Sequence, residues 1–409
     1  MAERRYKKLR TAPQLKRLLE QHYLAAKYFH PGKPIAWLTS GAPVEIIRAL
    51  DIFPVYPENY GALCGARGAS AAMCQVAEAR GYSPDLCAYA RSSVGMMNDA
   101  QHAPLGGLPR PDLLVTCGNI CGTVLKWYEA AARHYHAPLF ILDTPFIHAD
   151  DGEPTAHAIT YVAAQLEEMI AFLEKQTLRQ LSKEKLLETA LLSSEAVGLW
   201  REVRESCRAR PSPLNAPDLF LNMAPIVTLR GTKECVQFYR ALKEEIAARV
   251  AHRVSALPEE KYRLLWDNIA IWHHLYRFYN YFVEYGACFV VDTYTGGWAM
   301  KMDDQREPIG ALARTYTQVF INQGLRVRAR DMADLVTRFD VDGFVMHSNR
   351  SCKPYSVGQY DIRRIVTEQT GKPGLMIEAD HSDPRSYDDE AIQARIQTFM
   401  EGLKERARA

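Results

Sequence analysis

The chain has 409 residues, of which 47% are apolar and 24% charged, so it can bury a sizeable core. Lys and Arg number 50 and Asp and Glu 48, which leaves a formal net charge of only +2. This composition excludes a disordered tail and a small disulfide-stapled domain, and no long run of one charge sign predicts a nucleic-acid surface.

The N-terminal ten residues are basic and lack the apolar centre of a signal peptide, and no later segment offers about 20 uninterrupted apolar residues. We therefore expect a cytoplasmic protein that does not enter a membrane. The nine cysteines form an odd count, and with no export signal they predict reduced thiols rather than a disulfide framework.

The first part of the chain alternates between amphipathic stretches and short apolar runs bounded by turn residues. Such alternation is typical of a parallel sheet covered by helices. In chain order the pattern predicts a helix at 15–28, a strand at 35–38, a helix at 44–50, a strand at 111–116, a helix at 121–134 and a strand at 138–142.

Residues 153–210 are mostly helical in pattern, and a second alternating block follows. Its strands are predicted at 263–266, 288–291, 343–346 and 374–378. We predict an α/β fold with an N-terminal helix and two Rossmann-like or flavodoxin-like parallel-sheet lobes that flank a crevice. The predicted boundaries are 1–160 for the first lobe, 161–255 for a helical connection and 256–409 for the second lobe.

Several common motifs are missing from the sequence. There is no G-x-x-x-x-G-K-[ST] phosphate loop and no G-x-G-x-x-G after a strand, so ATP would have to be used by another chain. There is no C-x-x-C, which removes thioredoxin-type redox sites and zinc ribbons. The glycine-rich run at 61–68 is interpreted as a mobile loop because it lacks the lysine and hydroxyl of a nucleotide site.

Three cysteines stand at predicted loops or helix starts. Cys87 precedes a helical segment, Cys121 falls in the first turn of a helix that Asn119 is expected to cap, and Cys352 follows a strand. A helix N-terminus favours a thiolate, and loops after parallel strands are where such folds build sites. Spacing alone leaves a core role equally open for these three, whereas Cys207, Cys235 and Cys288 lie in core patterns.

Two histidine-containing segments can be interpreted either as functional sites or as purely structural elements. The pair at 273–274 lies in an aromatic-rich stretch, where packing is a better interpretation than metal ligation. Asp380 and His381, with Asp383 and Arg385, form a polar cluster after a strand, for which salt bridges and catalysis are equally compatible interpretations.

Six stretches, which span nearly the whole chain, carry a resemblance to a known family: 41–47, 53–58, 87–95, 119–129, 347–355 and 377–385. Taken together, they resemble the 2-hydroxyacyl-CoA dehydratase and benzoyl-CoA reductase family, of the D-component type. The last two matching stretches look most like the larger core subunit of the ATP-dependent, class I benzoyl-CoA reductases.

The resemblance implies two α/β lobes around a [4Fe-4S] cluster held by Cys87, Cys121 and Cys352, with one iron left open. It also places Ser40 beside a substrate thioester as a hydrogen-bond donor and Glu58 there as an acid/base group. The implied reaction is a two-electron dearomatisation of benzoyl-CoA, or another aromatic acyl-CoA, to a cyclic dienoyl-CoA. The implied partners are a smaller homologous core subunit, forming a heterodimer, and a separate ATP-hydrolysing iron-sulfur activator dimer.

Three alternatives remain open at this point. A 2-hydroxyacyl-CoA dehydratase, which eliminates water through a ketyl radical, would use the same ligands and the same kind of activator. Cys117, with Cys64 and Cys74, keeps open a double-cubane [8Fe-9S] protein that reduces small molecules, in which Cys117 would be an additional ligand. A non-catalytic relay subunit, whose partner binds the substrate, is the third.

Overall fold

The computed structural model describes residues 7–30, 32–300, 302 and 307–408. Within these residues the strands form two four-stranded, fully parallel sheets, with strand orders β2-β1-β3-β4 and β6-β5-β7-β8. The predicted α/β fold with two parallel-sheet lobes is thus confirmed. The strands are β1 (Ile35–Leu38), β2 (Phe53–Val55), β3 (Leu113–Cys117), β4 (Leu139–Leu142), β5 (Tyr262–Asp267), β6 (Ala287–Asp292), β7 (Gly343–Asn349) and β8 (Gly374–Ala379).

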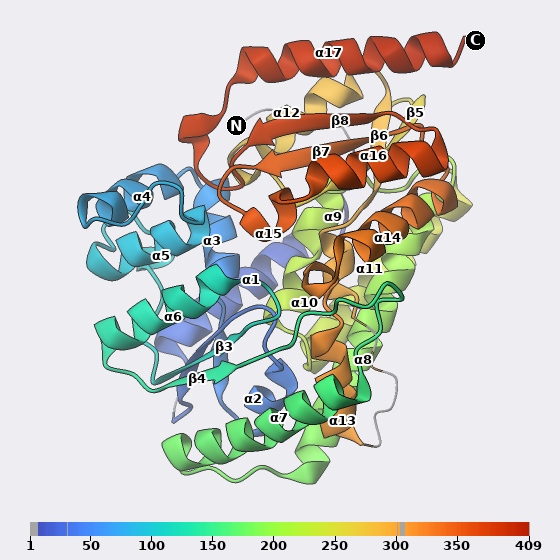
Figure 1. Ribbon diagram of the computed structural model, residues 1–409. Helices are drawn as coiled ribbons and strands as arrows, with labels where there is room; N and C mark the ends of the chain where they lie inside the picture. Colours follow the sequence, from blue (N-terminus) through green and yellow to red (C-terminus); the bar gives the residue numbers. More distant parts are fainter. Residues whose placement is uncertain (1–6, 31, 301, 303–306, 409) are drawn as a thin grey trace.

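Helices cover both faces of each sheet, which explains why most strands are continuous apolar runs instead of alternating ones. Figure 1 shows the two sheets in separate halves of the molecule, with α15 between them. The α-helices are α1 (Ala12–Tyr28), α2 (Val44–Ala49), α3 (Pro57–Ala66), α4 (Ser70–Ala79), α5 (Ala88–Asn98), α6 (Gly122–Tyr135), α7 (Ala156–Thr177), α8 (Lys183–Glu205), α9 (Ala216–Asn222), α10 (Ala224–Thr228), α11 (Lys233–Ala251), α12 (Leu275–Val283), α13 (Pro308–Thr317), α14 (Leu325–Arg338), α15 (Lys353–Ser356), α16 (Gln359–Thr370) and α17 (Asp389–Arg406).

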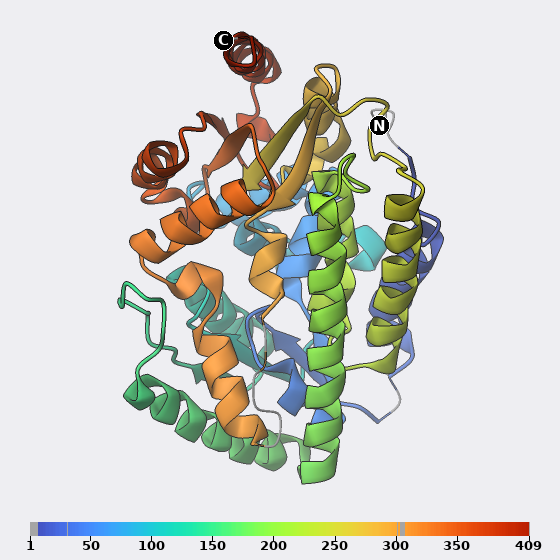
Figure 2. The same cartoon turned by 90° about the vertical axis from the view of Figure 1, so that its right-hand side faces the viewer.

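The two lobes are held together by long helices and by a shared core. Figure 2 shows α8 running along one side of the molecule past both lobes, with α11 beside it. Helix α13, from the second half of the sequence, returns to pack against α7 below the first sheet. One buried cluster includes Trp37 of β1 and Trp266 of β5, so the core continues from one lobe into the other. None of the helices in the described residues has the length and apolar character needed to cross a lipid bilayer.

The glycine-rich run at 61–68 is not a loop, so that prediction is wrong. It forms the second half of α3 and the turn that ends it. A Cβ on Gly61 would lie 2.6 Å from the Tyr89 ring, and one on Gly65 would lie 2.7 Å from Ser382 Oγ. These glycines are needed because other segments pack closely against the helix, and the sequence pattern of such packing is indistinguishable from that of a flexible loop.

Candidate active site between the lobes

Three thiols stand at the N-caps of three helices. Cys87 occupies the N-cap position of α5, Cys121 that of α6 and Cys352 that of α15. Burial raises the pKa of each thiol, and nearby backbone N–H groups at the start of each helix oppose the shift: those of Ala90 and Tyr89 at Cys87, Val124 and Thr123 at Cys121, and Tyr355 at Cys352. These donors stabilise negative charge on sulfur, as the positive end of a helix does.

The predicted cap at Asn119 is wrong, because Cys121 itself occupies the N-cap position. The Asn119 side chain instead donates hydrogen bonds to the carbonyl oxygens of Gly41, at 2.9 Å, and Tyr316, at 2.7 Å. It therefore fixes the loop that follows β3 against neighbouring segments.

The same three thiols are the half-buried cysteines of the chain, and they line one cavity of about 270 Å³ between the lobes. Burial raises the pKa of Cys87, and the neighbouring sulfurs of Cys352 and Cys121 raise it further. Burial, with Cys121 as a second cause, raises the pKa of Cys352 to about 12. Burial also raises the pKa of Cys121, and the charge of Glu58 adds to the shift. A positive group such as a metal centre among the three sulfurs would stabilise them as thiolates.

The chemistry of the three thiols fits the cluster that the sequence resemblance implies. Within the described residues, no three His, Cys, Asp or Glu side chains are close enough to share one metal ion. Three soft sulfur donors with helix N–H groups beside them also suit iron-sulfur ligation.

Ser40 and Glu58 line the same cavity as the thiols. Ser40 is buried just after β1, and Glu58 lies in the first turn of α3. The Ser40 backbone N–H donates to Glu58 Oε2 at 2.5 Å. Burial raises the pKa of Glu58 to about 7, although the hydrogen bonds from Ser40 oppose the shift. A carboxyl group with a pKa near neutrality can both accept and release a proton under physiological conditions.

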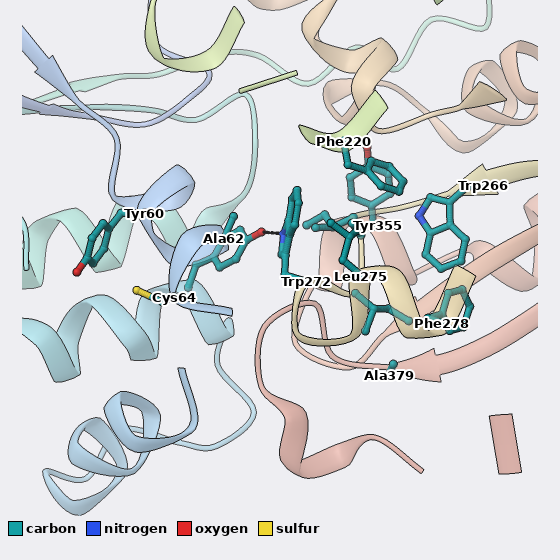
Figure 3. Close-up of a cluster of buried hydrophobic side chains, with 14 of the residues drawn as sticks. Tyr60, Ala62, Cys64, Phe220, Trp266, Trp272, Leu275, Phe278, Tyr355 and Ala379 are labelled. Carbon is teal, nitrogen blue, oxygen red and sulfur yellow. Dashed lines mark hydrogen bonds between the residues drawn. The ribbon is translucent and has the colours of Figure 1, made fainter. Parts of the chain in front are cut away.

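The rest of the cavity wall is mainly apolar and aromatic. Its charged lining residues are Glu58 and three residues that are exposed at the opening, namely Lys16, Glu20 and Arg67. Figure 3 shows Phe220, Trp272 and Tyr355 near one another between the two lobes. Trp272 Nε1 donates a hydrogen bond to Tyr89 Oη at 2.5 Å. The aromatic side chains of the wall are Tyr23, Tyr89, Trp127, Phe220, Trp272, Tyr294, Trp298, Phe320 and Tyr355.

No local sequence pattern signals this aromatic wall, because its members come from many separate segments of the chain. Phe220 illustrates the difficulty. It lies on α9, a helix that begins with a capping box of Asn215 and Asp218. The cap is readable from the sequence, but the cavity that the helix faces is not.

The remaining cysteines lie elsewhere. Cys117, the additional candidate ligand, is fully buried at the end of β3 with its Sγ 3.1 Å from Thr144 Oγ1, and it does not line the cavity. Cys207, Cys235 and Cys288 are fully buried in the core, as their patterns predict. Cys64 and Cys74 are also buried, in the first lobe.

The histidine pair at 273–274 packs as expected. The ring of His274 stacks on Tyr387 with 4.0 Å between centroids, and His273 Nε2 lies 2.9 Å from the Asp380 carbonyl oxygen.

The polar cluster at 380–385 joins the lobes through ion pairs. Arg91 Nη1 lies 2.6 Å from Glu78 Oε1 and 2.9 Å from Asp383 Oδ2, and Arg385 pairs with the same two carboxylates. Arg91 and Glu78 belong to the first lobe, whereas Asp383 and Arg385 follow β8. The salt-bridge interpretation of this cluster is therefore the one that the structure supports for Asp383 and Arg385.

Replacing Asp383 by Asn is expected to lower the free energy of unfolding by about 2 kcal/mol at pH 7. Burial alone would raise the pKa of Asp383, but hydrogen bonds from Arg385 and the charge of Arg91 lower it to about 2. Because this value lies below that of the unfolded chain, the stabilisation is present above about pH 4 and is lost as the pH falls toward 2.

Urea unfolding of both proteins at several pH values measures this difference. The matched control is Asp340→Asn, which removes an exposed ion pair with Arg210 and should change stability by less than about 1 kcal/mol. A difference between wild type and Asp383→Asn that stays constant from pH 7 to pH 3 would contradict the prediction.

Comparisons with known proteins find relatives that match nearly the whole chain. Residues 39–403 match the family described as "2-hydroxyglutaryl-CoA dehydratase, D-component". The chain is 34% identical over 391 residues to the (R)-2-hydroxyisocaproyl-CoA dehydratase alpha subunit of Clostridioides difficile, covering 95% of each chain. It is 32% identical to the (R)-phenyllactyl-CoA dehydratase alpha subunit of Clostridium sporogenes, covering 90% of this chain and 89% of the relative. It is also 29% identical to a benzoyl-CoA reductase subunit of Thauera aromatica, covering 90% of this chain and 88% of the relative.

Proposed function

The chain belongs to the 2-hydroxyglutaryl-CoA dehydratase D-component family, and on this premise we propose that it is the alpha-type subunit of a dehydratase acting on a 2-hydroxyacyl-CoA with an apolar side chain. Membership makes it a core subunit of an acyl-CoA dehydratase or reductase, and its relatives are subunits of multi-subunit enzymes of these two kinds. The observation that carries the proposal is that three N-cap thiols and the Ser40–Glu58 pair line one apolar cavity.

We assign Cys87, Cys121 and Cys352 as the ligands of a [4Fe-4S] cluster. When bound, such a cluster supplies an electron and, at the iron without a protein ligand, a Lewis-acidic position for a substrate oxygen. The position of Cys117 away from the cavity supports this smaller cluster over a double-cubane [8Fe-9S] cluster, which needs further thiolates.

Glu58 is the group proposed to move protons. Dehydration takes a hydrogen from C3 and the hydroxyl from C2, and the two leave as water. The ionised Glu58 would accept the C3 proton, and its pKa of about 7 makes the resulting acid able to pass that proton on. Ser40 holds the carboxylate in place through its backbone N–H and contributes a hydroxyl to the same wall.

The apolar wall of the cavity favours a substrate whose acyl group is apolar. A second carboxylate on the acyl chain would be buried without a cation, because the described charges of the wall are Glu58 and the exposed residues at the opening. Burying an unpaired carboxylate costs several kcal/mol, and repulsion from ionised Glu58 adds to that cost. The aromatic side chains around the cavity can pack against an aliphatic or an aromatic group.

The second candidate is the core subunit of an ATP-dependent benzoyl-CoA reductase, as the sequence resemblance favoured. The reductase relative and the aromatic wall support it. We rank it second because two dehydratase relatives have the higher identities, 34% and 32% against 29%. In both cases the proposed partners are a smaller homologous subunit and a separate ATP-hydrolysing iron-sulfur activator.

The two candidate reactions differ in the number of electrons that they consume, and this difference distinguishes them experimentally. The chain, its co-expressed partner subunit and an activator with ATP would be supplied anaerobically with phenyllactyl-CoA, 2-hydroxyisocaproyl-CoA, 2-hydroxyglutaryl-CoA or benzoyl-CoA. We expect the hydroxyacyl substrates to give enoyl-CoA and water with no net consumption of reductant. We expect kcat/KM for 2-hydroxyglutaryl-CoA to be at least about 100-fold lower than for phenyllactyl-CoA and 2-hydroxyisocaproyl-CoA. Formation of a cyclic diene from benzoyl-CoA, with two electrons consumed, would overturn the dehydratase proposal in favour of the reductase.

A further inference from the structure

A histidine from the second lobe reaches one of the three thiols. His381 is fully buried in the loop that follows β8, and its Nε2 lies 3.8 Å from Cys87 Sγ, within hydrogen-bonding distance for sulfur. The ring meets Tyr89 edge to face with 4.2 Å between centroids. The contact is therefore held by packing on the same helix that Cys87 caps.

The other ring nitrogen of His381 faces Asn349. Nδ1 lies 3.0 Å from Asn349 Oδ1, and the Nδ2 group of the same amide is buried without a hydrogen-bond partner. In this arrangement the proton is on Nδ1, so a neutral ring offers Nε2 as an acceptor. That suits a protonated Cys87 thiol, which can donate, but not a thiolate.

Rotation of the Asn349 amide by about 180° reverses this polarity. Nδ2 would then donate to His381 Nδ1, the ring proton would be on Nε2, and Nε2 would donate to Cys87 Sγ. Asp380 Oδ1, 3.7 Å from Nδ1, is already an acceptor for the backbone N–H groups of Ser382 and Asp383, so it does not force the proton onto Nδ1. The rotated amide pairs Nδ2 with His381 and places Oδ1 where Nδ2 has no partner, so the number of unpartnered amide atoms is the same in both orientations.

We propose that His381 is a positioning residue for the metal-bound Cys87, donating an Nε2–H···Sγ hydrogen bond that the Asn349 amide orients. The inference rests on the cluster ligation proposed above and adds a residue to it. A hydrogen bond to a ligating sulfur stabilises added negative charge, and it therefore raises the reduction potential of a cluster. Because His381 and Cys87 come from different lobes, the bond also couples ligand geometry to the packing of the lobes.

The test uses anaerobically purified complex with the partner subunit. His381→Phe keeps a ring of similar size without the N–H, and His381→Gln offers an amide N–H at a similar reach. His22→Phe is the matched control, because His22 is also a buried histidine, but its Nε2 has no hydrogen-bond partner and so contacts none of the three thiols. The measurements are the iron content, the midpoint potential in an EPR-monitored titration and the rate of iron loss to a chelator.

We expect a lower midpoint potential and several-fold faster iron loss in His381→Phe, values near wild type in His381→Gln, and no change in His22→Phe. A His381→Phe protein with full iron content and unchanged potential would overturn the inference. If that variant binds no iron, Asn349→Leu decides, since a lowered potential supports the inference and an unchanged one overturns it. A wild-type complex without iron would instead contradict the ligand assignment itself.

Discussion

Serine in place of Cys87, Cys121 or Cys352 is expected to leave the chain folded but without bound iron. Each thiol is half-buried at an N-cap, where serine is itself a favoured residue, so the helix starts should persist. A hydroxyl does not ionise in this range and is a poor ligand for iron in a cluster, so about four irons per chain should fall to near zero. Iron and acid-labile sulfide analysis of anaerobically purified complex measures the loss, and turnover should be abolished with it.

Cys117→Ser is the matched control for these three variants. Cys117 is also a thiol in the first lobe, four positions before Cys121, but its sulfur contacts Thr144 instead of the cavity. We expect this variant to keep its iron. Loss of iron from Cys117→Ser, together with about eight irons per wild-type chain, would contradict the three-ligand assignment and support the double-cubane alternative. Full iron content in all of the single serine variants would exclude ligation by these thiols.

The sequence was informative wherever a local pattern determines the structure. Buried strands of a parallel sheet are apolar runs, so 35–38 and 343–346 could be located from their composition and flanking turns. The three cavity thiols could be singled out for a related reason, because strand ends and helix starts are local signals. Their assignment as ligands came from the family resemblance and remains a proposal.

The sequence was uninformative where distant segments meet. His381 and Cys87 are separated by 294 positions, and no periodicity relates them. The run at 61–68 was misinterpreted for the same reason: its glycines are required by Tyr89 and by Ser382, a residue more than 300 positions away. Glycine is used both where the chain is flexible and where another segment packs closely against it, so the sequence alone does not distinguish the two cases. The tertiary structure does.

Glu58→Gln is the second variant with a large expected effect. The substitution keeps the size of the side chain and a carbonyl oxygen to accept from the Ser40 N–H, but it removes the group that would accept a proton. We expect kcat to fall by about 10²- to 10⁴-fold with an unchanged iron content. In wild type, kcat/KM should rise as the pH increases through about 7, where Glu58 ionises, and this limb should be absent from the variant.

Glu20→Gln is the control, since Glu20 lies at the exposed opening of the same cavity and should be replaceable with little loss of activity. A Glu58→Gln enzyme with wild-type turnover would exclude Glu58 as the proton acceptor. A loss of turnover accompanied by loss of iron would instead assign Glu58 to the integrity of the metal site, which separates the two roles.

The pH dependence of stability provides an independent measure of the pKa of the Glu58 carboxyl group. Because burial raises the pKa of Glu58 in the folded chain, the folded state holds a proton that the unfolded state has released between about pH 4.5 and pH 7. The wild-type fold therefore loses stability at this group as the pH rises through that interval, whereas Glu58→Gln does not. In the cluster-free chain, the variant should gain thermal stability relative to wild type between pH 5 and pH 8. Equal thermal stability of the two proteins across this interval would contradict the raised pKa of Glu58.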